Sequence, residues 1–190
     1  PKEEGLRQII YLKDSKPILR RKESKANNLK KIYKSHTPKD FIAIPSFTMG
    51  SETLYDFENF APEYEKVVEI YNAWGCSECT KAEGNLRPIL SKGKKGMKEK
   101  GEGSIRKALN KNLRFGFVAG GYDDRGPFAE LFDGDQVQYS PGITAILAQS
   151  HSRDGLMQAL SKRSCYATTG PRIIAGLEIA GQPMGSELST

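Results

Sequence analysis

Residues 41–51 have the sequence Phe-Ile-Ala-Ile-Pro-Ser-Phe-Thr-Met-Gly-Ser, and this stretch decides the predicted fold. Its first four residues are all apolar, which is typical of a strand that is buried on both faces. Pro45 has no N–H group to donate, so we expect the ladder of hydrogen bonds to end there. A polar loop that contains Gly50 then follows.

Two later stretches repeat this design of an apolar strand that leads into a polar loop. Residues 66–72 precede Trp-Gly-Cys-Ser-Glu-Cys, and residues 115–119 precede Gly-Gly-Tyr-Asp-Asp-Arg-Gly. Buried strands that each end in a polar loop are typical of a parallel sheet with a functional site at its carboxyl edge.

Shorter elements are predicted along the rest of the chain. Helices are expected after Asn28, Ser104 and Ser152, because a side-chain oxygen at these positions can accept a hydrogen bond from the first turn. Further elements are expected at residues 8–12 with 18–20 (a hairpin), 84–90 (a short helix), 142–148 and 165–168 (strands), and 172–185 (a hairpin). The alternation of strands and helices predicts an α/β fold with a largely parallel sheet.

Composition limits the class of protein. The 190 residues, of which 37% are hydrophobic, suit one globular domain or a large part of one, and no apolar run is long enough to cross a membrane. The formal charge is +6, and residues 91–103 are basic and glycine-rich, which predicts a flexible surface loop. That loop has no interleaved aromatic residues, so binding of nucleic acid is not expected. The chain begins at Pro1, so we expect a fragment of a larger protein whose compartment is not predicted.

Several of these stretches resemble the polymerase-and-histidinol-phosphatase (PHP) superfamily of metal-dependent phosphoesterases, in its large uncharacterised bacterial branch. The resemblance spans residues 5–186. Residues 41–48 are similar to the family's Ile-Pro-His-His-Thr strand end, and residues 68–78 to its next strand end. Residues 142–173, which include Tyr-Ala-Thr-Thr-Gly, are similar to its carboxyl-terminal signature.

The resemblance implies a fold and an activity. The expected fold is an incomplete, distorted (β/α) barrel of PHP type over residues 1–170, with a small β-hairpin extension at residues 171–190. The expected activity is hydrolysis of phosphate esters, with metals at the strand ends that generate a hydroxide. The implied partners are a phosphorylated small molecule and the missing amino-terminal part of the same protein.

The retained acids of the family pattern give candidate metal ligands. Glu69 and Asp123 remain at ligand positions, and Glu78 matches a family acid. The implied cofactor is a divalent metal such as manganese, zinc or iron. Glu69 lies inside an apolar strand, so it is either a buried group that needs a partner or a residue on a solvated face. Asp123 also lies in a glycine-flanked loop, where acids are common because they tolerate turns.

The residues that depart from the pattern predict a degenerate metal site. Ser46 and Phe47 stand where the family has histidines, and Trp74 stands where another is expected. Asp124 and Arg125 occupy the place of an Asp-x-His pair, and the whole chain has only two histidines. Imidazole is a preferred ligand of zinc, iron and manganese, so weak metal occupancy is expected.

Two other functions are compatible with the sequence. In the first, the chain kept the packing of the fold but lost its metal ligands. It then serves as a non-catalytic scaffold or as a binding module for an anionic molecule. Alternatively, Cys76 and Cys79 form a Cys-x-x-Cys pair after an apolar strand, which is typical of thiol–disulfide chemistry when the first thiol has a lowered pKa.

Overall fold

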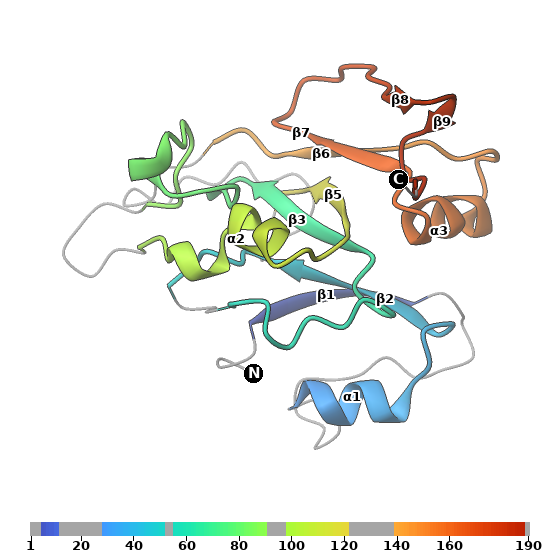
Figure 1. Cartoon of the computed structure of the whole chain (residues 1–190), viewed down its shortest axis with the longest axis horizontal. Coiled ribbons are helices and arrows are strands. Elements are labelled where there is room, and N and C mark those ends of the chain that lie inside the picture. The colour runs from blue at the N-terminus through green and yellow to red at the C-terminus, as the bar shows by residue number, and fades with distance from the viewer. Residues whose placement is uncertain (1–4, 12–27, 52–54, 91–97, 122–138, 189–190) are drawn as a thin grey trace.

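The computed structural model describes residues 5–11, 28–51, 55–90, 98–121 and 139–188 (Figure 1). Strand β1 (Leu6–Tyr11) pairs antiparallel with β2 (Phe41–Ser46). Strand β3 (Val67–Asn72) pairs in parallel with β5 (Gly116–Ala119) and antiparallel with the two-residue strand β4 (Gly75–Cys76). No helix in these ranges is long and apolar enough to cross a membrane.

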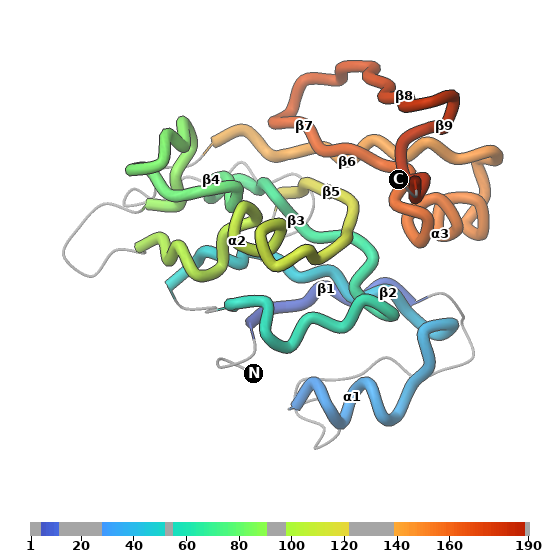
Figure 2. The backbone as a smooth tube through the Cα atoms, viewed as in Figure 1, coloured from blue at the N-terminus to red at the C-terminus, as the bar shows by residue number. Residues whose placement is uncertain are grey.

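The carboxyl-terminal part adds two antiparallel pairs. Strand β6 (Ile143–Ile146) pairs with β7 (Cys165–Thr168), and β8 (Glu178–Ile179) pairs with β9 (Gln182–Pro183). The backbone trace shows α3 (Arg153–Ser161) beyond one end of the β6–β7 pair, and the segment that carries β8 and β9 at the periphery (Figure 2). The hydroxyl of Thr144 joins β6 to β5, because it donates to the Ala119 carbonyl (2.8 Å) and accepts from the Ala119 amide (2.9 Å).

Capping residues begin the three helices as predicted. Helices α1 (Leu29–Ser35), α2 (Ile105–Asn110) and α3 start after Asn28, Ser104 and Ser152. Each of these side chains accepts a hydrogen bond from the amide three residues later. Such a bond satisfies one of the N–H groups that a helix leaves free in its first turn. The 3-10 turns η1 (Lys81–Glu83) and η2 (Gly101–Gly103) are the other helical elements of the described ranges.

Strand β3 is buried on both faces, as its apolar sequence predicts. On one face, Val67 packs in a cluster with residues of β2, β5, α3 and β7. On the other face, Val68 packs against Tyr55, Phe57, Phe115 and residues of α2. Helix α2 lies over this second face (Figure 1).

The prediction of an incomplete (β/α) barrel with largely parallel strands is wrong. The described strands form small, mostly antiparallel sheets, and only β3 and β5 pair in parallel. The α3 connection does not cross over a sheet, because the Leu147 amide donates to the Ser164 carbonyl (2.9 Å) and both ends of the connection lie together. The chain therefore returns from α3 antiparallel to β6.

Residues 8–11 pair with β2, and the rest of the predicted hairpin, residues 12 and 18–20, lies outside the described ranges. Two local predictions need correction. Pro45 does not end its strand, which pairs with β1 as far as Ser46. The Ala43 amide donates to the Tyr64 carbonyl, so it points away from β1. The nitrogen of Pro45, two residues later, faces the same way, so its missing N–H costs no hydrogen bond to β1. Residues 84–90 are not helical, because Gly84 has a positive φ of 98° that ends the η1 turn.

A buried ion pair ties four segments of the chain together. The Glu65 carboxylate is fully buried and accepts from Arg7 Nε of β1 (2.8 Å), from Tyr33 Oη of α1 (2.7 Å), and from Tyr55 Oη and the Ala61 amide (3.1 Å each). The Arg7 guanidinium also lies 3.9 Å from the centroid of the Tyr55 ring. The donors come from β1, from α1 and from two places in the β2–β3 connection, so the charge holds these parts of the chain in one arrangement.

We expect Arg7→Met to lower the free energy of unfolding by about 3–5 kcal/mol, because it leaves the buried Glu65 carboxylate without its cation. Arg106→Met is the matched control. It breaks the exposed Arg106–Glu78 pair, where the two side chains are 51% and 49% exposed, and it should cost at most about 1 kcal/mol. Urea unfolding of both variants measures the difference, and equal losses would show that the buried pair does not hold the fold.

Candidate functional site

Four strands bring residues to the carboxyl group of Glu69. Glu69 lies in β3 and is 3% exposed. Its Oε1 accepts from Gln8 Nε2 of β1 (3.2 Å), and its Oε2 accepts from Asn72 Nδ2 at the end of β3 (3.1 Å). Gly120, just after β5, is so close that a Cβ there would lie 3.4 Å from Glu69 Oε1. The end of β2 provides the remaining side of the site.

Ser46 and Phe47 lie at the end of β2 beside Glu69, where the Ser46 side chain and the Phe47 backbone both act to lower the pKa of the Glu69 carboxyl group. The Ser46 hydroxyl itself donates to the Ile44 carbonyl (3.1 Å). Phe47 has a positive φ of 54° and is 2% exposed. A bulky residue rarely adopts this conformation, and backbone strain of this kind clusters at functional sites.

Trp74 lies next to Phe47, with 5.7 Å between the ring centroids. The Trp74 amide donates to Asn72 Oδ1 (2.9 Å), which fixes the orientation of the Asn72 amide group. Because its oxygen is engaged, Asn72 must present its NH₂ group to Glu69. The structure therefore brings together Ser46, Phe47, Glu69 and Trp74 of the predicted site.

Burial raises the pKa of Glu69 to about 7, although the hydrogen bonds from Asn72, Gln8, Phe47 and Ser46 act in the opposite direction. A carboxyl group in a water-poor environment keeps its proton more tightly, since the charged form loses hydration. Near neutral pH this site thus holds a carboxyl group that is partly protonated.

Of the other predicted site residues, Asp123, Asp124 and Arg125 lie outside the described residues. Glu78 forms an exposed ion pair with Arg106 (3.2 Å). Among the described residues, no group of three or more His, Cys, Asp or Glu side chains is arranged to hold a metal ion.

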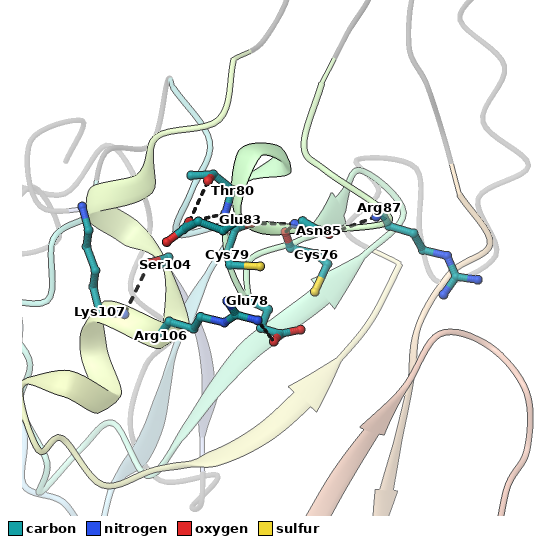
Figure 3. A network of polar contacts seen from close by, with 10 residues as sticks. All are labelled: Cys76, Glu78, Cys79, Thr80, Glu83, Asn85, Arg87, Ser104, Arg106 and Lys107. Atoms are coloured by element: carbon teal, nitrogen blue, oxygen red, sulfur yellow. Dashed lines mark hydrogen bonds and ion pairs between the residues drawn. The ribbon is translucent and has the colours of Figure 1, made fainter.

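Cys76 and Cys79 lie beneath the η1 turn (Figure 3). The Asn85 side-chain amide donates to the carbonyls of both residues (2.8 and 2.7 Å), so it holds the two backbone segments together. Both cysteines are free thiols, and burial raises the pKa of each. Thiol–disulfide exchange requires a lowered pKa, because the thiolate is the nucleophile.

Gln8 and Asn72 are the residues of this site that the sequence did not point to. Each is a polar residue in or at the end of a strand, a pattern that solvent-facing positions share. What could have identified them is where they lie in the fold. Gln8 pairs with the buried strand β2, and Asn72 is the last residue of β3.

Comparison with known proteins gives relatives but no activity. A family model described as "Protein of unknown function (DUF3604)" matches residues 97–188. Proteins named "Uncharacterized protein" from Chlamydia trachomatis and Chlamydia muridarum are each 54% identical to the chain over 189 residues, and one from Chlamydia pneumoniae is 53% identical over 190 residues. No solved structure matches the chain.

The same alignments cover 98–100% of this chain and 30% of each relative. The chain thus spans about a third of the length of these curated proteins. The prediction of an uncharacterised bacterial protein with a domain of unknown function is confirmed. Relationship to the PHP phosphoesterases, hydrolysis and metal binding stay predictions.

The raised pKa of Glu69 predicts a pH-dependent stability. Between about pH 4.5 and pH 7 the folded chain binds a proton that the unfolded chain has released. The stability that Glu69 contributes is therefore complete below pH 4.5 and falls as the pH rises toward 7, by about 3 kcal/mol. Glu69→Gln should flatten the pH dependence of urea unfolding between pH 5 and pH 8. Glu78→Gln is the control, and the same slope in all three proteins would contradict the buried, protonated carboxyl group.

The thiols of Cys76 and Cys79 should titrate above the ordinary pKa of cysteine, because Cys79 is buried and Cys76 is half-buried. The pH dependence of the rate of alkylation measures this in the variants Cys76→Ala and Cys79→Ala. A thiol that reacts at full rate below neutral pH would contradict the structure and would support disulfide exchange.

Proposed function

We propose that this chain is part of a larger, non-catalytic relative of the metal-dependent PHP phosphoesterases and that it serves as a scaffold. In this proposal, Glu69 occupies a former ligand position and no longer binds metal. The observation that carries the proposal is the pair of amide donors on the Glu69 carboxyl group, Gln8 Nε2 and Asn72 Nδ2.

Amide donors and a metal ion make opposite demands on a carboxylate. A ligating carboxylate directs an oxygen lone pair at the cation, whereas both oxygens of Glu69 face N–H groups, which cannot bind a cation. The orientation of Asn72 is fixed by the Trp74 amide, so this donor cannot turn its oxygen toward a metal without losing that bond.

The protonation of Glu69 supports the same proposal. Metal ligands must be deprotonated, and a carboxyl group whose pKa is about 7 carries a proton in about half of the molecules at neutral pH. A strongly bound metal would reverse this preference by stabilising the charged form. The N–H groups of Gln8 and Asn72 favour the charged form of the Glu69 carboxyl group, but burial outweighs them.

Aromatic packing supports a structural role for the positions where the family has histidines. Phe47 is buried with Met49 and Ile89, and Trp74 packs against this cluster. The side chains of Phe47 and Trp74 are thus part of an apolar cluster, and apolar side chains do not bind metal. The resulting core joins the end of β2 to the segment that follows β4.

The test is the metal content of the full-length protein after dialysis against manganese, zinc and iron. We expect Glu69→Gln to leave the metal content per chain unchanged, because Glu69 holds no metal, and to leave the protein folded. Glu78→Gln is the matched control at an exposed acid. A metal that is lost in Glu69→Gln and kept in Glu78→Gln would overturn the proposal and would support a functional phosphoesterase site.

A further inference from the structure

The segment between β7 and the end of β9 exposes four large apolar side chains. Ile173 is 58% exposed, Ile174 98%, Leu177 58% and Ile179 56%. They lie within seven consecutive residues, and every residue from Pro171 to Pro183 is exposed. Single exposed apolar residues are ordinary, but a contiguous apolar surface of this kind marks a site of protein contact. We call residues 173–179, which carry these four side chains, the apolar segment.

The apolar segment is held in place at both of its ends. Near its start, the Tyr166 hydroxyl donates to the Ile173 carbonyl (2.6 Å) and accepts from the Ala175 amide (3.0 Å). After its end, the Ser164 hydroxyl donates to the Met184 carbonyl (3.2 Å). Because Ser164 and Tyr166 flank the start of β7, the segment leaves and returns to the same strand. It is a presented surface and not a free tail.

The hairpin at the end of this segment is specified by its turn. Ala180 and Gly181 both have positive φ values, 52° and 74°, and they connect the pairs Glu178–Pro183 and Ile179–Gln182. Two central residues with positive φ form the tight turn that suits a two-residue hairpin. Yet a lone two-stranded hairpin is at best marginally stable in water. A well-specified hairpin that buries nothing within the described residues calls for a covering partner.

The relatives indicate where such a partner comes from. This chain aligns with them almost from end to end and still accounts for 30% of their length. The matching family model runs through residue 188, so the apolar segment belongs to the region that the family shares. Most of the polypeptide of each relative thus lies outside the matched part.

We propose that the apolar segment is the surface on which the remainder of the full-length protein packs, through an apolar face of its own. Ile173, Ile174, Leu177 and Ile179 supply the contact, and the hairpin β8–β9 is stabilised by being covered. The contact is intramolecular, so it does not depend on protein concentration. This inference does not rest on the loss of metal binding proposed above.

Thiol labelling of the full-length protein tests the proposal. Cysteine is introduced by Ile174→Cys, by Ile179→Cys, or by the control Leu86→Cys, since Leu86 is 94% exposed and lies outside the apolar segment. The unsubstituted full-length protein gives the background of the native thiols. We expect maleimide labelling at positions 174 and 179 to be at least about tenfold slower than at position 86, at every protein concentration.

Two results would overturn the proposal. Labelling at positions 174 and 179 that is as fast as at position 86 would show that nothing covers the segment. Protection that disappears on dilution, together with a dimer in light scattering, would assign the surface to a second copy of the protein. Because two separate positions are tested, the failure of one variant to fold does not remove the test.

Discussion

The buried charge of Glu65 is the constraint on which the amino-terminal half depends. A carboxylate without contact to solvent is tolerated only when cations and hydrogen-bond donors surround it. Its donors come from β1, α1 and the connection before β3, and Arg7 lies 58 residues away in the sequence. Since neighbouring residues of a strand face opposite sides, holding Arg7 against Glu65 directs Gln8 to the other side of β1, where it meets Glu69. The ion pair therefore also builds the candidate site.

Glu65 and Glu69 are four residues apart, and both are buried carboxyl groups that are stabilised in different ways. Glu65 forms a buried ion pair with Arg7 (2.8 Å). Glu69 has only neutral donors, so burial raises its pKa and it accepts a proton near neutral pH. In the proposed function, where Glu69 is a former ligand position, this contrast explains how the residue can persist without a metal. Taking up a proton limits the cost of burial, because the neutral form of the carboxyl group loses less hydration than the charged form.

Local features could be predicted from the sequence, and pairings between distant segments could not. Asn28, Ser104 and Ser152 identified the helix starts, because a cap acts within three residues of itself. The prediction of a parallel sheet was wrong because a strand–helix–strand pattern does not show whether the helix crosses over the sheet. Helix α3 does not cross over, and β6 and β7 on either side of it are antiparallel. Ser46, Phe47, Glu69 and Trp74 were named from the resemblance to the PHP family, whose pattern they match or depart from. Gln8 was missed because its role depends on β1 pairing with β2, which links residues far apart in sequence.

The two ends of the described fold differ in how they are stabilised. The β2–β3–β5 core is closed by side chains on both faces of β3, and its polar groups find partners within the chain. The β8–β9 hairpin has a suitable turn and anchored ends, yet its large side chains face outward. Backbone bonds to Tyr166 and Ser164 fix the position of this segment but bury no apolar area, which is the dominant favourable term in folding. A segment with fixed geometry and no core of its own is therefore organised to complete a core that it shares with another part of the protein.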